Sequence, residues 1–195
     1  MAKKVQKNLL LTLVAVVLSV LTAVTFFLPT YKTADDSDGK LRVSACELCF
    51  ISNEKAKENA EDALKEGDKD AYLDNLFVIM INADDTITFT NEYKESALAG
   101  AWLHFVAFVA SIVVVALLII NMLKNKFGTI AKFATILPVL FMIGSLICSI
   151  ILINKGDFDG NINLTICGNI LGLISAIATA VVTFLPVKKS KKAKN

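Results

Sequence analysis

Two cysteines three positions apart, in Cys46-Glu47-Leu48-Cys49, form the sharpest chemical motif of the chain. A pair at this spacing can form a redox disulfide or supply half of a zinc site. Residues 29–97 contain no further Cys and no His, so we predict no metal and no cofactor. A redox pair needs a thiol with a lowered pKa, whereas the negative charge of Glu47 opposes thiolate formation. Arg42 is the nearest cation in sequence, and in an extended strand it would lie roughly 13 Å from Cys46, too far to lower the pKa strongly. We predict a structural or free pair and no catalytic residue, with redox use of Cys46 and Cys49 as the alternative.

A second set of polar residues lies inside apolar runs, at similar distances from one end of each run. At 1.5 Å per helical residue, they share a depth of roughly 7–10 Å. One interpretation is hydrogen bonding between helices, at about 0.6 kcal/mol per contact. The alternative is a small polar pocket open to the outer face. The predicted layer consists of Thr22, His104, Cys148, Cys167 and Asn169.

Long apolar runs must position these residues. Runs of about 20 residues without charge cross the hydrocarbon core as helices. We therefore predict transmembrane helices at 9–28, 98–123, 133–153 and 162–187. They divide the chain into an N-terminal segment 1–8, a long loop 29–97, short loops 124–132 and 154–161, and a tail 188–195. Pro138 lies within the third run and should kink it, because proline removes a backbone hydrogen bond.

Charge alternates between the segments outside the runs. The N-terminal segment, the 124–132 loop and the tail hold eleven lysines and no acid, whereas the other two loops hold all eighteen carboxylates. Lysine-rich segments stay in the cytoplasm, so we predict a cell-membrane protein with both termini on the cytoplasmic side. Nineteen lysines against one arginine suggest a bacterial source. The basic tail suits anionic lipid head groups and consists of Lys188, Lys189, Lys191, Lys192 and Lys194. With sixteen acids against eight bases, the 29–97 loop makes nucleic acid an unsuitable partner.

Small residues recur every four positions in the first and last runs. Such ridges let helix backbones approach closely in lipid. We predict that both ridges lie in helix–helix contacts within the chain, and the alternative is that one faces a partner or a second copy. The ridges are Ala15, Ser19 and Ala23 in the first run, and Gly168, Gly172, Ala176 and Ala180 in the last. No Asp, Glu, Lys or Arg lies within the runs, which argues against an ion-coupled transporter.

The 29–97 loop is too long to be a structureless connector and predicts a small α+β domain. Residues 41–52 have strand character. Ser52 or Asn53 should cap a helix that runs to about Glu66 and stops at Gly67. Residues 77–82 and 86–91 predict a hairpin.

Four spans, an outward Cys-x-x-Cys motif and a second pair, Cys148 and Cys167, resemble the quinone-linked disulfide-forming oxidoreductases. Cys46-Glu47-Leu48-Cys49-Phe50 is similar to the cysteine motif of their first outer loop, and this resemblance implies a redox role. The layout of a long first outer loop with strands, a short inner loop and a short second outer loop also resembles claudin-type tetraspan proteins. The tryptophan motif of that first loop has no counterpart, because Trp102 is the only Trp.

The predicted fold is therefore a mainly α membrane protein: a four-transmembrane-helix bundle with a small α+β outer domain inserted between helices 1 and 2. The predicted function is non-enzymatic, with the outer domain mediating protein interaction or assembly, including homo-oligomers. Two alternatives stay open. One is a membrane thiol–disulfide oxidoreductase that uses Cys46 and Cys49, and the other is an accessory subunit of a transporter.

Overall fold

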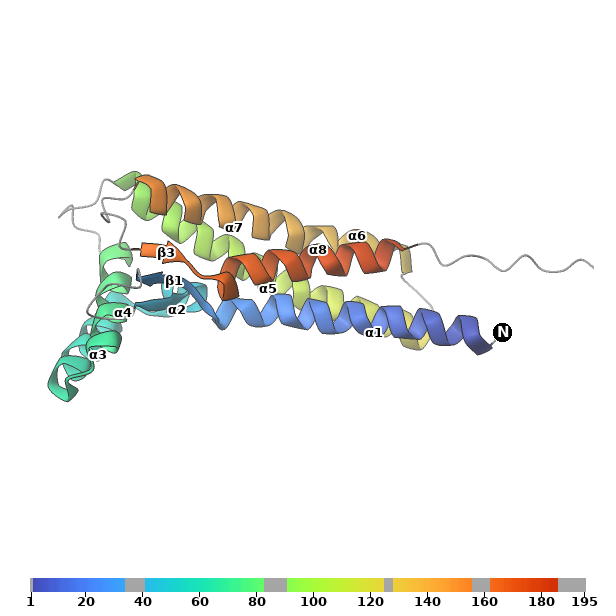
Figure 1. Ribbon diagram of the computed structural model, residues 1–195, viewed down its shortest axis with the longest axis horizontal. Helices are drawn as coiled ribbons and strands as arrows, with labels where there is room; N and C mark the ends of the chain where they lie inside the picture. Colours follow the sequence, from blue (N-terminus) through green and yellow to red (C-terminus); the bar gives the residue numbers. More distant parts are fainter. Residues whose placement is uncertain (1, 34–40, 83–90, 125–127, 156–161, 186–195) are drawn as a thin grey trace, which may run out of the picture.

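A computed structural model of the chain describes residues 2–33, 41–82, 91–124, 128–155 and 162–185. Long helices run lengthwise beside one another, and a smaller region lies at the end of this bundle opposite the N-terminus (Figure 1). We call this smaller region the head and define it as residues 29–33, 41–82 and 162–164. The prediction of a mainly helical chain is confirmed.

Four helical segments are long and apolar enough to cross a membrane: Leu9–Phe27, Glu95–Lys124, Gly128–Asn154 and Ile166–Phe184. The first lies in α1 (Ala2–Val24) and the 3₁₀ turn that follows it (Thr25–Phe27), and the second lies in α5 (Asn91–Lys124). The third contains α6 (Gly128–Ala134) and α7 (Ile136–Lys155). The fourth contains a π-helical turn (Ile166–Ile170) and α8 (Leu171–Phe184). The predicted number of apolar spans is confirmed.

The third span is interrupted at Thr135, between α6 and α7. Pro138 lies three residues further on and has no N–H to donate to the carbonyl group of Ala134, four residues before it. The hydroxyl of Thr135 donates instead to the carbonyl of Lys132, at 2.6 Å. The helix is therefore interrupted next to Ala134, whose carbonyl group lacks the backbone hydrogen bond that residue 138 would otherwise donate.

The helices form a closed ring of neighbours. α1 packs against α5 and α8, and α7 packs against the same two helices. Buried positions in the ring are mostly small or polar, such as Ala15, Ala107 and Ala176, whereas Leu, Val and Ile side chains dominate the exposed surface. This inverted pattern is typical of helices that face lipid.

The head contains a three-stranded antiparallel sheet with the order β2-β1-β3. Its strands are β1 (Pro29–Thr33), β2 (Arg42–Ser44) and β3 (Ile162–Leu164). Tyr31 of β1 stands opposite Val43 of β2 and Leu164 of β3. Residues 162–164 were predicted to belong to the fourth span, so that part of the prediction is wrong. They pair with β1, and the span begins only after Thr165, whose side chain accepts a hydrogen bond from the N–H of Gly168.

The predicted helix after Ser52 is confirmed as α3 (Asn53–Glu66). The Ser52 side chain accepts from the N–H of Lys55, and Gly67 ends the helix with a left-handed φ of 73°. The predicted strand 41–52 is wrong beyond Ser44. Ser44 and Glu47 form a reciprocal capping box, and this cap starts helix α2 (Ala45–Phe50).

The predicted strand 77–82 is also wrong, because α4 (Lys69–Asn82) includes it. Phe77, Val78 and Ile81 are buried on one face of this helix. Their i, i+1, i+4 spacing fits a helix packed on one side better than a strand that alternates between two faces. The other predicted arm, 86–91, lies outside the described residues except for its last position.

One hydrophobic cluster joins the head to the ends of the spans. It contains Tyr31 and Val43 from the sheet, Phe77 from α4, Phe26 from the first span and Leu152 from α7. Because this cluster is continuous, the sheet is packed directly on the bundle.

Candidate functional site

A buried polar cluster lies where the sheet meets the spans. The hydroxyl of Tyr31 donates to Ser149 Oγ at 3.0 Å, and Asn169 Nδ2 donates to the same oxygen at 3.0 Å. Ser145 Oγ donates to Asn169 Oδ1 at 3.3 Å. All of these side chains are at most 1% exposed. The cluster therefore joins β1, α7 and the first turn of the fourth span through polar atoms removed from solvent.

A second buried cluster joins α1, its 3₁₀ turn, α5 and α8. The hydroxyls of Thr22 and Ser175 lie 2.9 Å apart. Thr25 Oγ1 donates to the carbonyl of Thr22 at 2.7 Å and lies 3.2 Å from His104 Nε2. Because the single hydroxyl proton of Thr25 is used on that carbonyl, His104 Nε2–H is the donor to Thr25 Oγ1. His104 Nδ1 is then an acceptor, and it has no hydrogen-bond partner among the described residues.

The predicted polar layer is divided between these clusters. Thr22, His104 and Asn169 lie inside the bundle, but each bonds to a residue outside the predicted set. Cys148 is only partly buried, and Cys167 is exposed. The structure thus does not bring the five predicted side chains together.

Sequence reasoning missed five members of the clusters. Ser145 and Ser149 are spaced i, i+4 on one face of α7, a signal that the sequence contained. The others are Thr25, Tyr31 and Ser175, whose roles depend on which helices become neighbours.

The small-residue ridges face other parts of the chain. A Cβ atom on Gly168 would lie 2.6 Å from the carbonyl oxygen of Pro29, and one on Gly172 would lie 2.6 Å from Thr25 Oγ1. Ala176 is 1% exposed. On the first ridge Ala15, Ser19 and Ala23 are buried, and on the last only Ala180 is partly exposed. The lysines of the predicted tail, 188–194, lie outside the described residues.

All four cysteines are free thiols. Cys46 and Cys49 lie on α2 and pack against the hydrophobic cluster of the head. Burial raises the pKa of Cys46, and the charge of Glu47 raises it further. Burial also raises the pKa of Cys49 to about 12, with a smaller contribution from Cys46. Both thiols are therefore protonated at neutral pH, which opposes nucleophilic or redox use.

Within the described ranges, no group of three or more His, Cys, Asp or Glu side chains could hold a metal ion. The polar atoms of the two clusters are largely committed to hydrogen bonds between segments. This arrangement can fix how helices are rotated against one another, and its described members include no charged nucleophile, acid or base.

Comparisons with known protein families, with curated proteins and with solved structures give no match to this chain. The four apolar helices are compatible with an integral membrane protein of the multi-pass type.

Proposed function

We propose that this chain is a non-enzymatic integral membrane protein whose head binds a protein partner outside the cytoplasm. The observation that carries the proposal is the helical hairpin of α3 and α4, which extends from the sheet away from the bundle (Figure 1). Ala56, Ala60 and Ala63 bury one side of α3. The other side exposes charged residues and Leu64, which is 66% exposed. We propose Leu64, an apolar side chain within this exposed polar face, as a contact point for the partner.

The proposed orientation rests on charge. Short lysine-rich segments favour the cytoplasm. The acidic loop that contains α3 and α4 connects the first and second spans, and in this orientation it lies on the opposite side of the membrane. Both termini are then cytoplasmic. The partly buried, protonated thiols and the committed polar clusters support a binding role over a catalytic one.

The test is recovery of the partner from native membranes after mild detergent extraction. Leu64→Ser should weaken partner recovery by about tenfold, the effect of removing one well-packed contact. Leu123→Ser is the matched control, because Leu123 is 72% exposed on α5 near the end of the bundle that lies away from the head. The control should recover the partner as the wild-type chain does.

Equal recovery by the wild-type chain and Leu64→Ser would contradict the proposed surface. Catalytic turnover by the purified chain would contradict the non-enzymatic assignment. If the recovered partner is a larger permease, the protein interaction is that of a transporter accessory subunit.

A further inference from the structure

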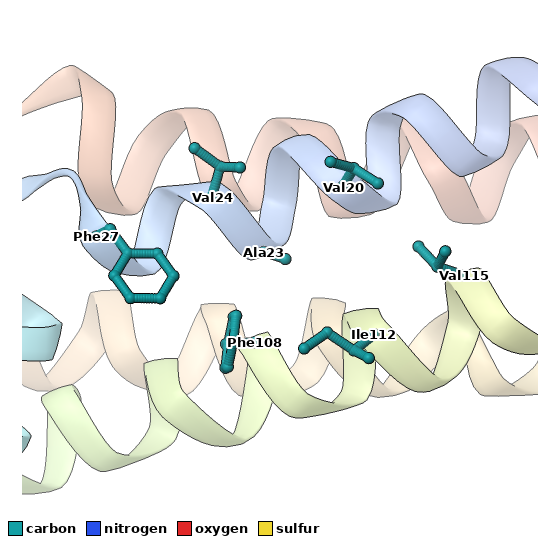
Figure 2. A pocket seen from close by; sticks show the side chains of 7 residues that line it. All are labelled: Val20, Ala23, Val24, Phe27, Phe108, Ile112 and Val115. Atoms are coloured by element: carbon teal, nitrogen blue, oxygen red, sulfur yellow. The ribbon is translucent and has the colours of Figure 1, made fainter.

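An apolar groove of about 190 Å³ lies between the first span and α5. In Figure 2, Ala23 and Phe27 of the first span lie toward Phe108 and Ile112 of α5. The lining is Val20, Ala23, Val24 and Phe27 on one side and Phe108, Ile112 and Val115 on the other. Because every lining residue is apolar and belongs to a candidate span, the groove faces hydrocarbon when the spans cross a bilayer.

Exposed aromatic rings continue the groove toward the head. Phe27 and Phe108, which line the groove, have ring centroids 5.5 Å apart. Phe108 lies 6.1 Å from Phe105, Phe105 lies 5.3 Å from Phe50, and Phe50 lies 6.0 Å from Trp102. We call these five residues the aromatic shelf. Phe27, Phe50 and Trp102 are each about half exposed, at 55%, 57% and 47%.

The aromatic shelf marks where the lipid-facing surface ends. Trp settles at the level of the head groups, because its ring is apolar and its N–H is polar. Phe50 belongs to α2 of the head and contacts Trp102 and Phe105 of α5. The apolar surface of the spans therefore continues without interruption through the groove to an interfacial aromatic edge.

The walls of the groove decide between a lipid chain and another helix. Helix association in membranes favours small residues at the surface, because they allow backbones to approach. The exposed walls here are Val20, Val24, Phe27 and Ile112, whereas the small Ala23 is buried at the floor. A second helix would have to approach across these branched and aromatic side chains, which keep its backbone at a distance, whereas a single flexible chain can lie between them.

We propose that this groove holds one acyl chain of a membrane phospholipid, with the ester and head-group end beside the aromatic shelf. The chain runs along the groove from the mid-membrane level of Val115 toward Phe27. Because Phe50 comes from the head, the bound lipid also contacts the head at the membrane surface.

Photo-crosslinking in vesicles tests the proposal. The probe is phosphatidylglycerol with a diazirine midway along one acyl chain, diluted into unlabelled lipid of the same head group. Adducts are located by mass spectrometry of peptides. Ile112 is 49% exposed in the groove, and Leu140 and Ile147 of α7 are 58% and 52% exposed outside it. Labelling should be higher at Ile112 than at either α7 position, although its exposure is no greater.

A matched pair of α1 variants isolates the groove. Val20→Phe places a ring in the groove, and Val17→Phe places the same ring on the same helix at a 60% exposed position outside the lining. Val20→Phe should lower labelling at Ile112, because its ring occupies space that the acyl chain would fill. Val17→Phe should leave it unchanged.

Three results would overturn the proposal: equal labelling of Ile112 and the α7 positions, equal loss in both variants, or cross-links between two copies of the chain in place of lipid adducts. The comparison of α5 with α7 uses the wild-type protein, so it stands even where Val20→Phe does not assemble.

Discussion

Gly168→Ala tests whether the sheet and the fourth span meet through backbone contact. The new Cβ would lie 2.6 Å from the carbonyl oxygen of Pro29 and 2.9 Å from Thr30 Cα. The first distance is 0.8 Å shorter than the 3.4 Å at which ordinary contact begins. Both atoms belong to the backbone of β1, which is paired on both sides. The strand therefore cannot move away without disturbing its hydrogen bonds.

Overpacking of this kind costs about 1–3 kcal/mol of folding free energy. Because the new Cβ meets backbone atoms of β1, which cannot move as a side chain can, we expect a cost near about 3 kcal/mol. For a chain of this length, about 3 kcal/mol lowers Tm by roughly 6–12 °C. Gly144→Ala is the control, since the atoms nearest to its Cβ all belong to the Leu103 side chain, and the closest is the terminal methyl Cδ1 at 3.1 Å. A small shift of that methyl accommodates it. Replacing a glycine within a helix by alanine gains about 0.5–1 kcal/mol, so this variant should be as stable as the wild-type chain or slightly more so.

Thermal unfolding followed by circular dichroism, in one detergent for all three proteins, gives the comparison. Size-exclusion chromatography beforehand establishes that each variant is folded and uniform. If Gly168→Ala and Gly144→Ala unfold at the same temperature, the close approach of β1 to the fourth span is refuted.

Three further predictions use other parts of the chain. In a double-mutant cycle, Tyr31→Phe and Ser149→Ala should show a coupling free energy of about 0.6 kcal/mol in detergent unfolding, and additive effects would contradict their hydrogen bond. Burial raises the pKa of Asp74 to about 6 in the folded chain, so its contribution to stability is present at low pH and is lost as pH rises from about 4 to about 6. Over this pH range the free energy of unfolding should fall by about 1 kcal/mol less in Asp74→Asn than in the wild-type chain, after a discount for partial exposure. The same pH profile of unfolding in both proteins would refute the assignment. In a cysteine-free background, an impermeant thiol reagent applied to intact cells should label Glu61→Cys and not Lys4→Cys, and the reverse pattern would invert the proposed orientation.

The sequence predicted what is encoded locally. Length and lack of charge identified the spans, because a bilayer imposes one length on every helix that crosses it. The boundaries of α3 followed from Ser52 and Gly67, whose side-chain oxygen and missing Cβ satisfy local backbone requirements. These predictions needed no knowledge of the remaining chain.

The head was predicted less well because its elements depend on distant partners. Ile162, Asn163 and Leu164 continue an apolar run into the fourth span, and only pairing with β1, more than 120 residues earlier, makes them a strand. The apolar run 77–82 has strong strand propensity. In the folded chain its burial against the head core on one side selects a helix instead.

In the polar clusters, too, the sequence identified some of the residues but not their hydrogen-bond partners. His104, Thr22 and Asn169 stand out as polar residues in apolar runs, so the sequence identified them. Their partners could not be assigned, because hydrogen bonding depends on how each helix is rotated about its axis. Cys167 was placed in the polar layer by depth alone, and rotation instead leaves it exposed.

Asn169 shows how a buried polar side chain can determine the rotation of a helix about its axis, which apolar burial alone leaves undetermined. In lipid, rotating a helix exchanges one apolar surface for another at little cost, so hydrophobicity alone leaves the rotation undetermined. Asn169 bonds two serines of α7, and a wrong rotation of the fourth span would leave its amide without partners. Its position within the π-helical turn Ile166–Ile170, directly after β3, means that the same rotation also sets the direction in which the sheet strand leaves the span. The buried amide thereby connects helix orientation to sheet pairing, and this structural role accounts for a buried polar residue at the junction of the sheet and the bundle.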